Sequence, residues 1–188
     1  RDWSSDVCSS DLNTGCYPPL YSEPDEAMQP RLICICGPNG AGKSTYTRTI
    51  ATMENLLVID PDKLAADGLS PIAAGKAAAK MARLFLENGI SFARESTLTS
   101  HFDFTLMSEA KKKGYSIELV YIGLESSDLA WARVASRAAR GGHFVPHEDV
   151  IRRYTRSLEN LPKAIALADK ATILDNSTQG YRLIQIAK

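Results

Sequence analysis

The chain has 188 residues, of which 44% are apolar and 23% are charged, and its 22 basic side chains balance 22 acidic ones. This length and apolar content supply the core of one domain, which excludes an intrinsically disordered chain. The longest apolar runs are about five residues, far below the roughly 20 that cross a bilayer, so no membrane partner is expected. The balanced charge argues against a surface that binds nucleic acid throughout.

The first thirty residues differ from the rest of the chain. From residue 2, the first twelve resemble the translation of a sequencing-library adapter, and they lack the basic-then-apolar pattern of a signal peptide. Residues 13–30 contain four prolines that interrupt any periodic pattern. We expect a non-native, disordered tail over 1–30 and one domain over 31–188. That domain holds 21 basic against 16 acidic side chains, a net charge of +5.

From residue 31 onward, short apolar runs alternate with longer helical patterns. Strands are predicted at 32–36, 56–59, 90–94, 116–122, 172–174 and 182–186, and helices beginning near Lys43 and over 71–87, 101–113, 128–140 and 147–168. This alternation is typical of a parallel sheet with helices on both faces. The predicted fold class is therefore α/β, with no internal repeat and no second domain.

The four cysteines are Cys8, Cys16, Cys34 and Cys36, and they include no metal-type C-x-x-C pair. The last two are two residues apart in an apolar run, so they share one face of the first strand. Free cysteine commonly packs as a small hydrophobe, and reduced thiols favour the cytoplasm. We expect core packing and a cytoplasmic protein.

The segment after the first predicted strand fits the Walker A pattern G-x-x-x-x-G-K-[ST], called a P-loop. It contains Gly37, Pro38, Asn39, Gly40, Ala41, Gly42, Lys43, Ser44 and Thr45. Glycines let the backbone N–H groups surround a phosphate at a helix N-terminus. Lys43 would reach the β- and γ-phosphates of ATP, and the Ser44 hydroxyl would bind Mg²⁺. A plain glycine-rich turn explains the glycines but not the lysine and serine.

A P-loop by itself does not separate a kinase from an ATPase, a GTPase or a nucleotide-gated switch. The chain has no N-K-x-D guanine-reading motif, which disfavours a GTPase. The 158 residues from 31 to 188 are short for a nucleic-acid motor. Phosphoryl transfer to a small substrate fits this size best, in a kinase-like fold.

Carboxylates follow the second and third predicted strands. Asp60 and Asp62 come after the second strand, and Glu95 is expected just beyond the third. Ligands of open α/β sheets bind outside the carboxyl ends of the strands, where a kinase needs a carboxylate to orient and deprotonate the acceptor hydroxyl. The alternative roles are a helix cap for Asp60 or Asp62 and a structural ion pair for Glu95.

An arginine-rich segment follows, with a net charge of +4 and no lysine. It contains Arg133, Arg137, Arg140, Arg152, Arg153 and Arg156. Arginine forks suit polyphosphates, and a basic segment of small kinases closes over the donor, so we expect a small Arg-rich lid. The Gly141-Gly142 pair would supply a hinge, which favours Arg137 and Arg140 over Arg133 and Arg156. His143 is either a lid contact or a polar loop residue.

Together these segments resemble the zeta toxin family of P-loop kinases. The resemblance lies in GPNGAGKST at 37–45, IDPDKLA at 59–65, ESTL at 95–98, GGHFVP at 141–146, RRYTRSLENLP at 152–162 and DNS at 175–177. It spans nearly all of residues 31–188. The P-loop is shared by many families, whereas its combination with the other segments is much more specific.

The resemblance implies an ATP-dependent kinase that phosphorylates a sugar hydroxyl of UDP-N-acetylglucosamine or a related UDP-sugar. By position, Lys43 and Ser44 would hold ATP and Mg²⁺, and Asp62 would be the general base. Glu95 and Thr97 would contact the substrate, and Arg137 would bind phosphate during transfer, with Arg140 nearby on ATP. An epsilon-type antitoxin is the implied partner.

The residues leave three alternatives open. One is a kinase for another small hydroxyl compound, such as an antibiotic, a nucleotide or a sugar acid. Another is a nucleotide-binding regulator with little turnover. The third is a nucleic-acid end kinase, which would show steep salt dependence in binding.

Overall fold

The computed structural model describes residues 29–142, 144–178 and 180–187. The expected tail falls almost wholly outside the described residues, and so does His143. The sheet has the strand order β2-β3-β1-β4-β5-β6, in which all pairs are parallel except β5 with β6. Its strands are β1 (Arg31–Cys36), β2 (Leu57–Ile59), β3 (Phe92–Ser96), β4 (Ser116–Gly123), β5 (Lys170–Asp175) and β6 (Arg182–Ala187).

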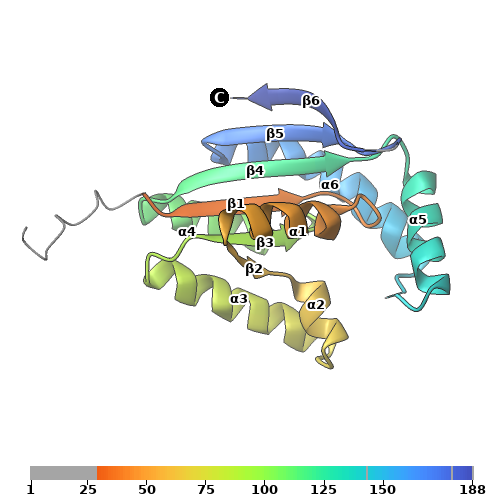
Figure 1. Cartoon of the computed structure of the whole chain (residues 1–188), viewed down its shortest axis with the longest axis horizontal. Helices are drawn as coiled ribbons and strands as arrows, with labels where there is room; N and C mark the ends of the chain where they lie inside the picture. Colours follow the sequence, from red (N-terminus) through yellow and green to blue (C-terminus); the bar gives the residue numbers. More distant parts are fainter. Residues whose placement is uncertain (1–28, 143, 179, 188) are drawn as a thin grey trace, which may run out of the picture.

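Helices cover both faces of the sheet (Figure 1). They are α1 (Lys43–Glu54), α2 (Pro61–Ala66), α3 (Pro71–Glu87), α4 (His101–Lys112), α5 (Ser127–Ala139) and α6 (His147–Leu167). Apolar side chains of α3, α4 and α6 share one buried cluster, and those of α1 and α5 contribute to the other. The predicted α/β class, a mostly parallel sheet between two helical layers, is confirmed. None of the described helices is both long and apolar enough to span a membrane.

The central strand β1 is buried on both faces, as its unbroken apolar sequence predicts. Leu32, Cys34 and Cys36 pack into the cluster under α3 and α4, and Ile33 and Ile35 pack into the other. Both cysteines are free thiols. Their expected packing on one face of the first strand is confirmed.

Two local predictions were wrong, and both errors concern the ends of strands. The strand predicted at 90–94 runs from Phe92 to Ser96, because the backbone N–H of Ile90 donates to Phe85 O and closes the turn after α3. Glu95 therefore lies within β3, not beyond it. The short helix α2 was not predicted; Asp60 caps it by accepting a 2.9 Å hydrogen bond from the Asp62 N–H, and Pro61 begins it.

The carboxyl ends of β1, β2, β3 and β4 lie at the same end of the sheet, where their arrows point in Figure 1. The chain leaves β1 between β3 and β4, so the P-loop starts in the middle of this end. Crevices at such a position bind ligands in open α/β sheets. The fold thus brings the sequence motifs after β1, β2 and β3 to one place.

Candidate active site

The P-loop connects β1 to α1 with a backbone that only glycine fits. Gly37 has φ 144°, and a Cβ there would collide with the Ile122 carbonyl of β4. Gly42 has φ 91° and immediately precedes α1, where a Cβ would lie 2.6 Å from Asn176 Nδ2. The positive φ angles and the close approaches explain the motif's glycines. The loop leads directly into the N-terminus of a 12-residue helix, an arrangement that favours anions.

Residues after β5 hold the P-loop from the outside. Asn176 Nδ2 donates a 2.9 Å hydrogen bond to Ala41 O, and the Tyr181 hydroxyl donates a 2.8 Å hydrogen bond to Gly42 O. The Tyr181 ring also packs edge-on against Tyr46, with ring centroids 5.3 Å apart. Sequence analysis identified the DNS segment only by resemblance, and the structure gives its Asn176 a defined role in shaping the P-loop.

Lys43 lies at the mouth of the P-loop. Its ammonium donates hydrogen bonds to Gly37 O at 2.9 Å and Pro38 O at 3.0 Å. Burial lowers the pKa of Lys43, whereas the carboxylates of Glu95 and Asp62 oppose that shift. The negative charge of a bound triphosphate would further favour the protonated form of this lysine.

Ser44 and Glu95 lie together beside Lys43. The Ser44 hydroxyl donates a 2.9 Å hydrogen bond to Glu95 Oε2, and Glu95 is only 5% exposed. Burial and the Asp60 charge raise the pKa of Glu95, and hydrogen bonds from Thr47 and Ser44 partly offset this. A hydroxyl and a carboxylate are oxygen ligands of the kind Mg²⁺ prefers, with water and phosphate oxygens completing its shell. The pair therefore fits the expected Mg²⁺, and the substrate contact expected of Glu95 stays a prediction.

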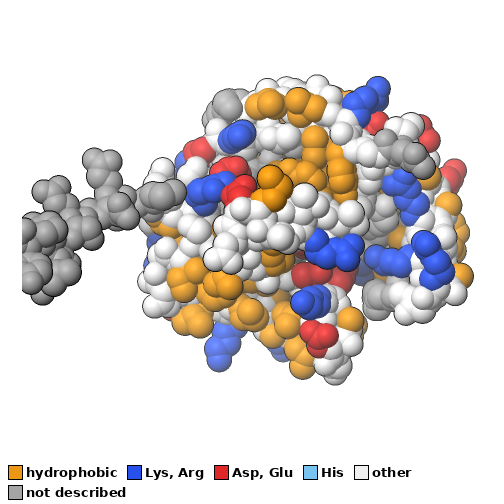
Figure 2. All heavy atoms as spheres, in the orientation of Figure 1, with side chains coloured by type: hydrophobic (Ala, Val, Ile, Leu, Met, Phe, Trp, Pro, Cys, Tyr) orange, Lys and Arg blue, Asp and Glu red, His pale blue; other side chains and the backbone are white. Residues whose placement is uncertain are grey.

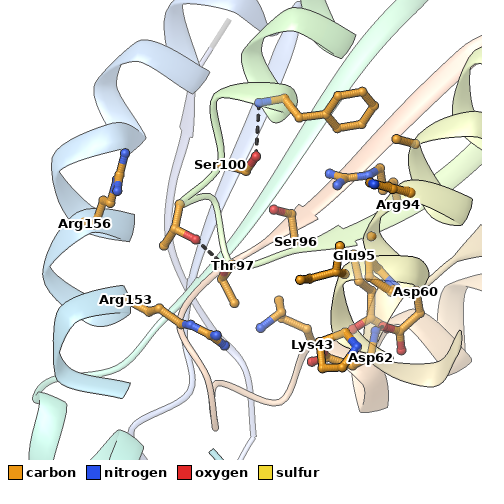
Figure 3. A pocket seen from close by; sticks show the side chains of 18 of the residues that line it. Lys43, Asp60, Asp62, Arg94, Glu95, Ser96, Thr97, Ser100, Arg153 and Arg156 are labelled. Atoms are coloured by element: carbon orange, nitrogen blue, oxygen red, sulfur yellow. Dashed lines mark hydrogen bonds between the residues drawn. The ribbon is translucent and has the colours of Figure 1, made fainter. Parts of the chain in front are cut away.

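The two aspartates after β2 have different roles. Asp60 uses Oδ1 to cap α2, which is the alternative role considered for it. Burial, then the Asp62 charge, raises the pKa of Asp60. Asp62 belongs to the first turn of α2, is exposed, and lines a cavity together with Lys43. Figure 3 shows Asp62 and Lys43 beside each other. Asp62 therefore lies where an acceptor hydroxyl could approach.

Thr97 lies in the loop between β3 and α4, and Leu98 fixes this loop. Leu98 has φ 58°, a left-handed conformation that is costly for leucine. Its N–H donates to Ser96 Oγ at 2.9 Å, its carbonyl accepts from Asn160 Nδ2 at 2.8 Å, and its side chain is fully buried. The Thr97 hydroxyl lies 2.9 Å from that of Thr99, and both residues line the cavity.

The cavity has a volume of about 640 Å³ and lies at the carboxyl end of the sheet. Figure 2 shows basic and acidic side chains gathered at this end, between α2 and α5. Figure 3 shows Arg153 extending from α6 toward Lys43, with Arg156 further along the same helix; both line the cavity. Its charged lining residues are Lys43, Lys76, Arg94, Arg152, Arg153, Arg156, Asp60, Asp62 and Glu95.

The expected lid arginines lie elsewhere. Arg140 donates from Nε to Ser136 O, and neither Arg137 nor Arg140 lines the cavity. Their binding of donor phosphates stays a prediction. Arg156, which sequence analysis ranked lower, lines the cavity with Arg153, and Arg133 packs beside Gly40. The direction in which α6 crosses the sheet decides which arginines line the cavity. No pattern within the arginine-rich segment indicates that direction.

A P-loop after the central strand, with its lysine, serine and an adjacent glutamate, defines the P-loop kinase class of fold. Residues 69–182 match the family model described as Zeta toxin. An uncharacterized protein of Haemophilus influenzae is 35% identical over an alignment of 133 residues that covers 68% of this chain and 94% of that protein. The chain belongs to the zeta toxin family.

Solved structures confirm the fold. A chain from the PezAT chromosomal toxin–antitoxin system of Streptococcus pneumoniae superposes with a TM-score of 0.65 at 17% identity, covering 86% of this chain and 73% of that one. A chain of the AvrRxo1-ORF1:-ORF2 complex with ATP gives a TM-score of 0.66 at 14% identity, covering 85% and 59%. A kinase-like protein of Chloroflexus aurantiacus, described as a putative kinase, gives a TM-score of 0.51 at 24% identity, covering 61% and 70%.

Proposed function

We propose that the protein is an ATP-dependent kinase that transfers the γ-phosphoryl group to a sugar hydroxyl of UDP-N-acetylglucosamine or a related UDP-sugar. The observation that carries this proposal is the single cavity shared by Lys43, Asp62, Glu95 and Thr97. The family membership of the chain supports the choice of acceptor.

On the donor side, the P-loop N–H groups and Lys43 would hold the β- and γ-phosphates. Ser44 and Glu95 would hold Mg²⁺ directly or through water, and the ion would neutralise charge on the phosphate oxygens. Arg153 extends toward Lys43 from the α6 wall of the cavity, which Arg156 also lines, and guanidinium groups there can stabilise the charge of the transferring group.

On the acceptor side, Asp62 would accept the proton of the attacking hydroxyl. The acceptor oxygen forms a bond to the γ-phosphorus while the bond from that phosphorus to the bridging oxygen breaks, releasing ADP. Thr97 would orient the acceptor by hydrogen bonding through its hydroxyl. Asp62 then returns its proton to solvent, which its exposed position permits.

The likeness to a chain from a toxin–antitoxin system supports a further part of the proposal, in which an epsilon-type antitoxin binds this protein in the cytoplasm. The open cavity is also compatible with a kinase for another small hydroxyl compound. A low-turnover regulator would bind nucleotide equally well, and only the rate of transfer distinguishes it from a kinase.

The test is incubation with Mg·ATP and a panel of UDP-sugars, followed by product masses that reveal an added phosphoryl group. Asp62→Asn should retain ATP binding and slow transfer by about 10²- to 10⁴-fold, since it removes the proton acceptor. Lys43→Ala should weaken both ATP binding and transfer. Asp67→Asn, an exposed control just after α2, should change neither. Wild-type rates for Asp62→Asn would exclude Asp62 as the base.

A further inference from the structure

Arg94 is a charged residue in the interior of the sheet. It is the third residue of β3 and lies opposite Cys34 of β1 and Ile59 of β2. It is only 8% exposed and lines the cavity. Arginine is almost never so buried unless it has partners, so its environment must compensate for the lost hydration.

Two neighbours in α4 fix the guanidinium of Arg94. Its Nη1 pairs with Asp103 Oδ1, and Asp103 is itself 4% exposed. The Phe102 ring lies against the guanidinium, with its centroid 5.1 Å from Cζ. The other oxygen of Asp103 accepts a 2.7 Å hydrogen bond from Ser96 Oγ. Asp103 does not line the cavity, so this pairing anchors Arg94 from behind.

Asp103 pairs with the Nη1 atom of the Arg94 guanidinium, and not every other N–H donor of the guanidinium has a partner. Within the described residues, Arg94 Nε is buried without a hydrogen-bond partner. Figure 3 shows the Arg94 side chain beside Ser96 and Glu95, with its guanidinium directed toward the cavity. A buried donor is costly to leave unpaired, so this N–H group is suited to an oxygen atom of a bound molecule.

The charges of the cavity indicate which oxygen. Six of the charged residues that line the cavity are cations and three are carboxylates, so the lining is positive overall. Two of the carboxylates, Asp60 and Asp62, follow Ile59 of β2, which lies opposite Arg94. Arg94 and Asp62 line the same cavity, so one bound acceptor can contact both residues. Guanidinium forks bind carboxylate and phosphate oxygens through two parallel hydrogen bonds.

We propose that Arg94 binds an anionic group of the acceptor, so that the acceptor is an alcohol that also carries a phosphate or a carboxylate. The inference rests on the proposed kinase function and adds to it the residue that recognises the charged group, which in a UDP-sugar is the diphosphate. Arg94 is a specificity residue: it contacts the acceptor away from the hydroxyl that is phosphorylated.

The test compares neutral and charged alcohols as matched pairs. The probes are N-acetylglucosamine against its 1-phosphate and its UDP derivative, and glucose against glucuronate. Binding is measured by calorimetry with the ATP analogue AMP-PNP and Mg²⁺ at saturation, and transfer is measured by product mass with Mg·ATP. Wild type should bind the charged member of at least one pair about tenfold or more tightly than the neutral member. The pair that responds identifies phosphate or carboxylate as the group recognised.

Two variants keep Asp103 from becoming an unpaired buried charge. Arg94→Lys preserves the positive charge but not the fork, and Arg94→Met with Asp103→Asn removes both charges while keeping an acceptor for Ser96. Arg94→Lys should weaken the preference for the charged alcohol, the double variant should abolish it, and both should leave AMP-PNP affinity unchanged. The control is Arg83→Met, since Arg83 stacks on the same Phe102 ring at 5.5 Å but does not line this cavity.

Equal affinity of wild type for charged and neutral alcohols, or no binding of any charged probe, would overturn the inference while leaving kinase activity open to its own test. Charged probes that bind through Arg94 without any transfer would instead refute the kinase proposal and leave this site in place. Thermal melting followed by circular dichroism identifies a variant that has not folded. The comparison of charged with neutral alcohols on the wild-type protein does not depend on any variant.

Discussion

At the scale of single residues, the burial of Glu95 links catalysis to stability. Its pKa is raised chiefly by burial, so the folded protein holds this proton at pH values where the unfolded chain has released it. The stability of the wild type therefore falls as pH rises from the ordinary glutamate value through the raised one. The carboxylate that would hold Mg²⁺ reduces the stability of the fold at neutral pH.

Glu95→Gln imitates the protonated side chain and should remove this dependence. Without nucleotide at pH 7.5, we expect the variant to have a higher melting temperature than wild type. The difference between the two melting temperatures should shrink toward zero below pH 4.5. The variant should also lose Mg²⁺-dependent transfer. Thermal denaturation across pH measures the first two effects. Glu87→Gln, on the exposed end of α3, is the control. A variant that is less stable than wild type at pH 7.5 would contradict this interpretation.

At the scale of secondary-structure elements, Asn160 joins α6 to the loop after β3. Its side-chain amide holds the Leu98 carbonyl, and Leu98 keeps a left-handed conformation next to Thr97. The same helix carries Arg156 about one turn earlier and Arg153 about two turns earlier. One helix therefore positions both the cationic wall and the acceptor loop of the cavity.

Asn160→Ala should release the Leu98 carbonyl and let Thr97 move. Because the P-loop makes none of these contacts, we expect the acceptor KM to rise several-fold and the affinity for Mg·ATP to stay at the wild-type value. Steady-state kinetics with each substrate varied in turn measures both. Glu159→Ala, on the exposed neighbour, should behave as wild type. Equal losses for donor and acceptor would mean that Asn160 supports the fold generally.

At the scale of the whole molecule, nucleotide binding should stabilise the fold. The P-loop contacts β4, α5 and the segment after β5 through Gly37, Gly40 and Gly42, so a bound triphosphate connects much of the sheet. A ligand at 100 times its Kd adds about 2.7 kcal/mol to the unfolding free energy. For a domain of this size, each kcal/mol shifts the melting temperature by about 2–4 °C.

Saturating Mg·ATP should therefore raise the melting temperature by about 5–10 °C. Chelating Mg²⁺ with EDTA should reduce the shift, since Ser44 and Glu95 would then hold no ion, and Lys43→Ala should nearly abolish it. Differential scanning fluorimetry measures all three. A full shift in Lys43→Ala would show that the nucleotide binds elsewhere.

The sequence by itself determined the features that depend on contiguous residues. Alternating apolar runs and helical patterns predicted the α/β class. Residues 37–45 predicted the P-loop, because a tight glycine turn and a helix start are specified within nine positions directly after a strand. The same local reasoning placed the third predicted strand two residues too early. It also missed α2, a helix of six residues that Asp60 caps directly after a strand, because so short a helix has no clear periodic pattern.

The tertiary structure alone decided which distant residues meet. Asn176 reaches Ala41 across 135 positions, Arg94 lies next to the cavity, and α6 brings Arg153 and Arg156 to the wall facing Lys43. These contacts follow from the strand order and from the direction in which each helix crosses the sheet. Both are set by packing over the whole core, and no periodicity within a single segment records them.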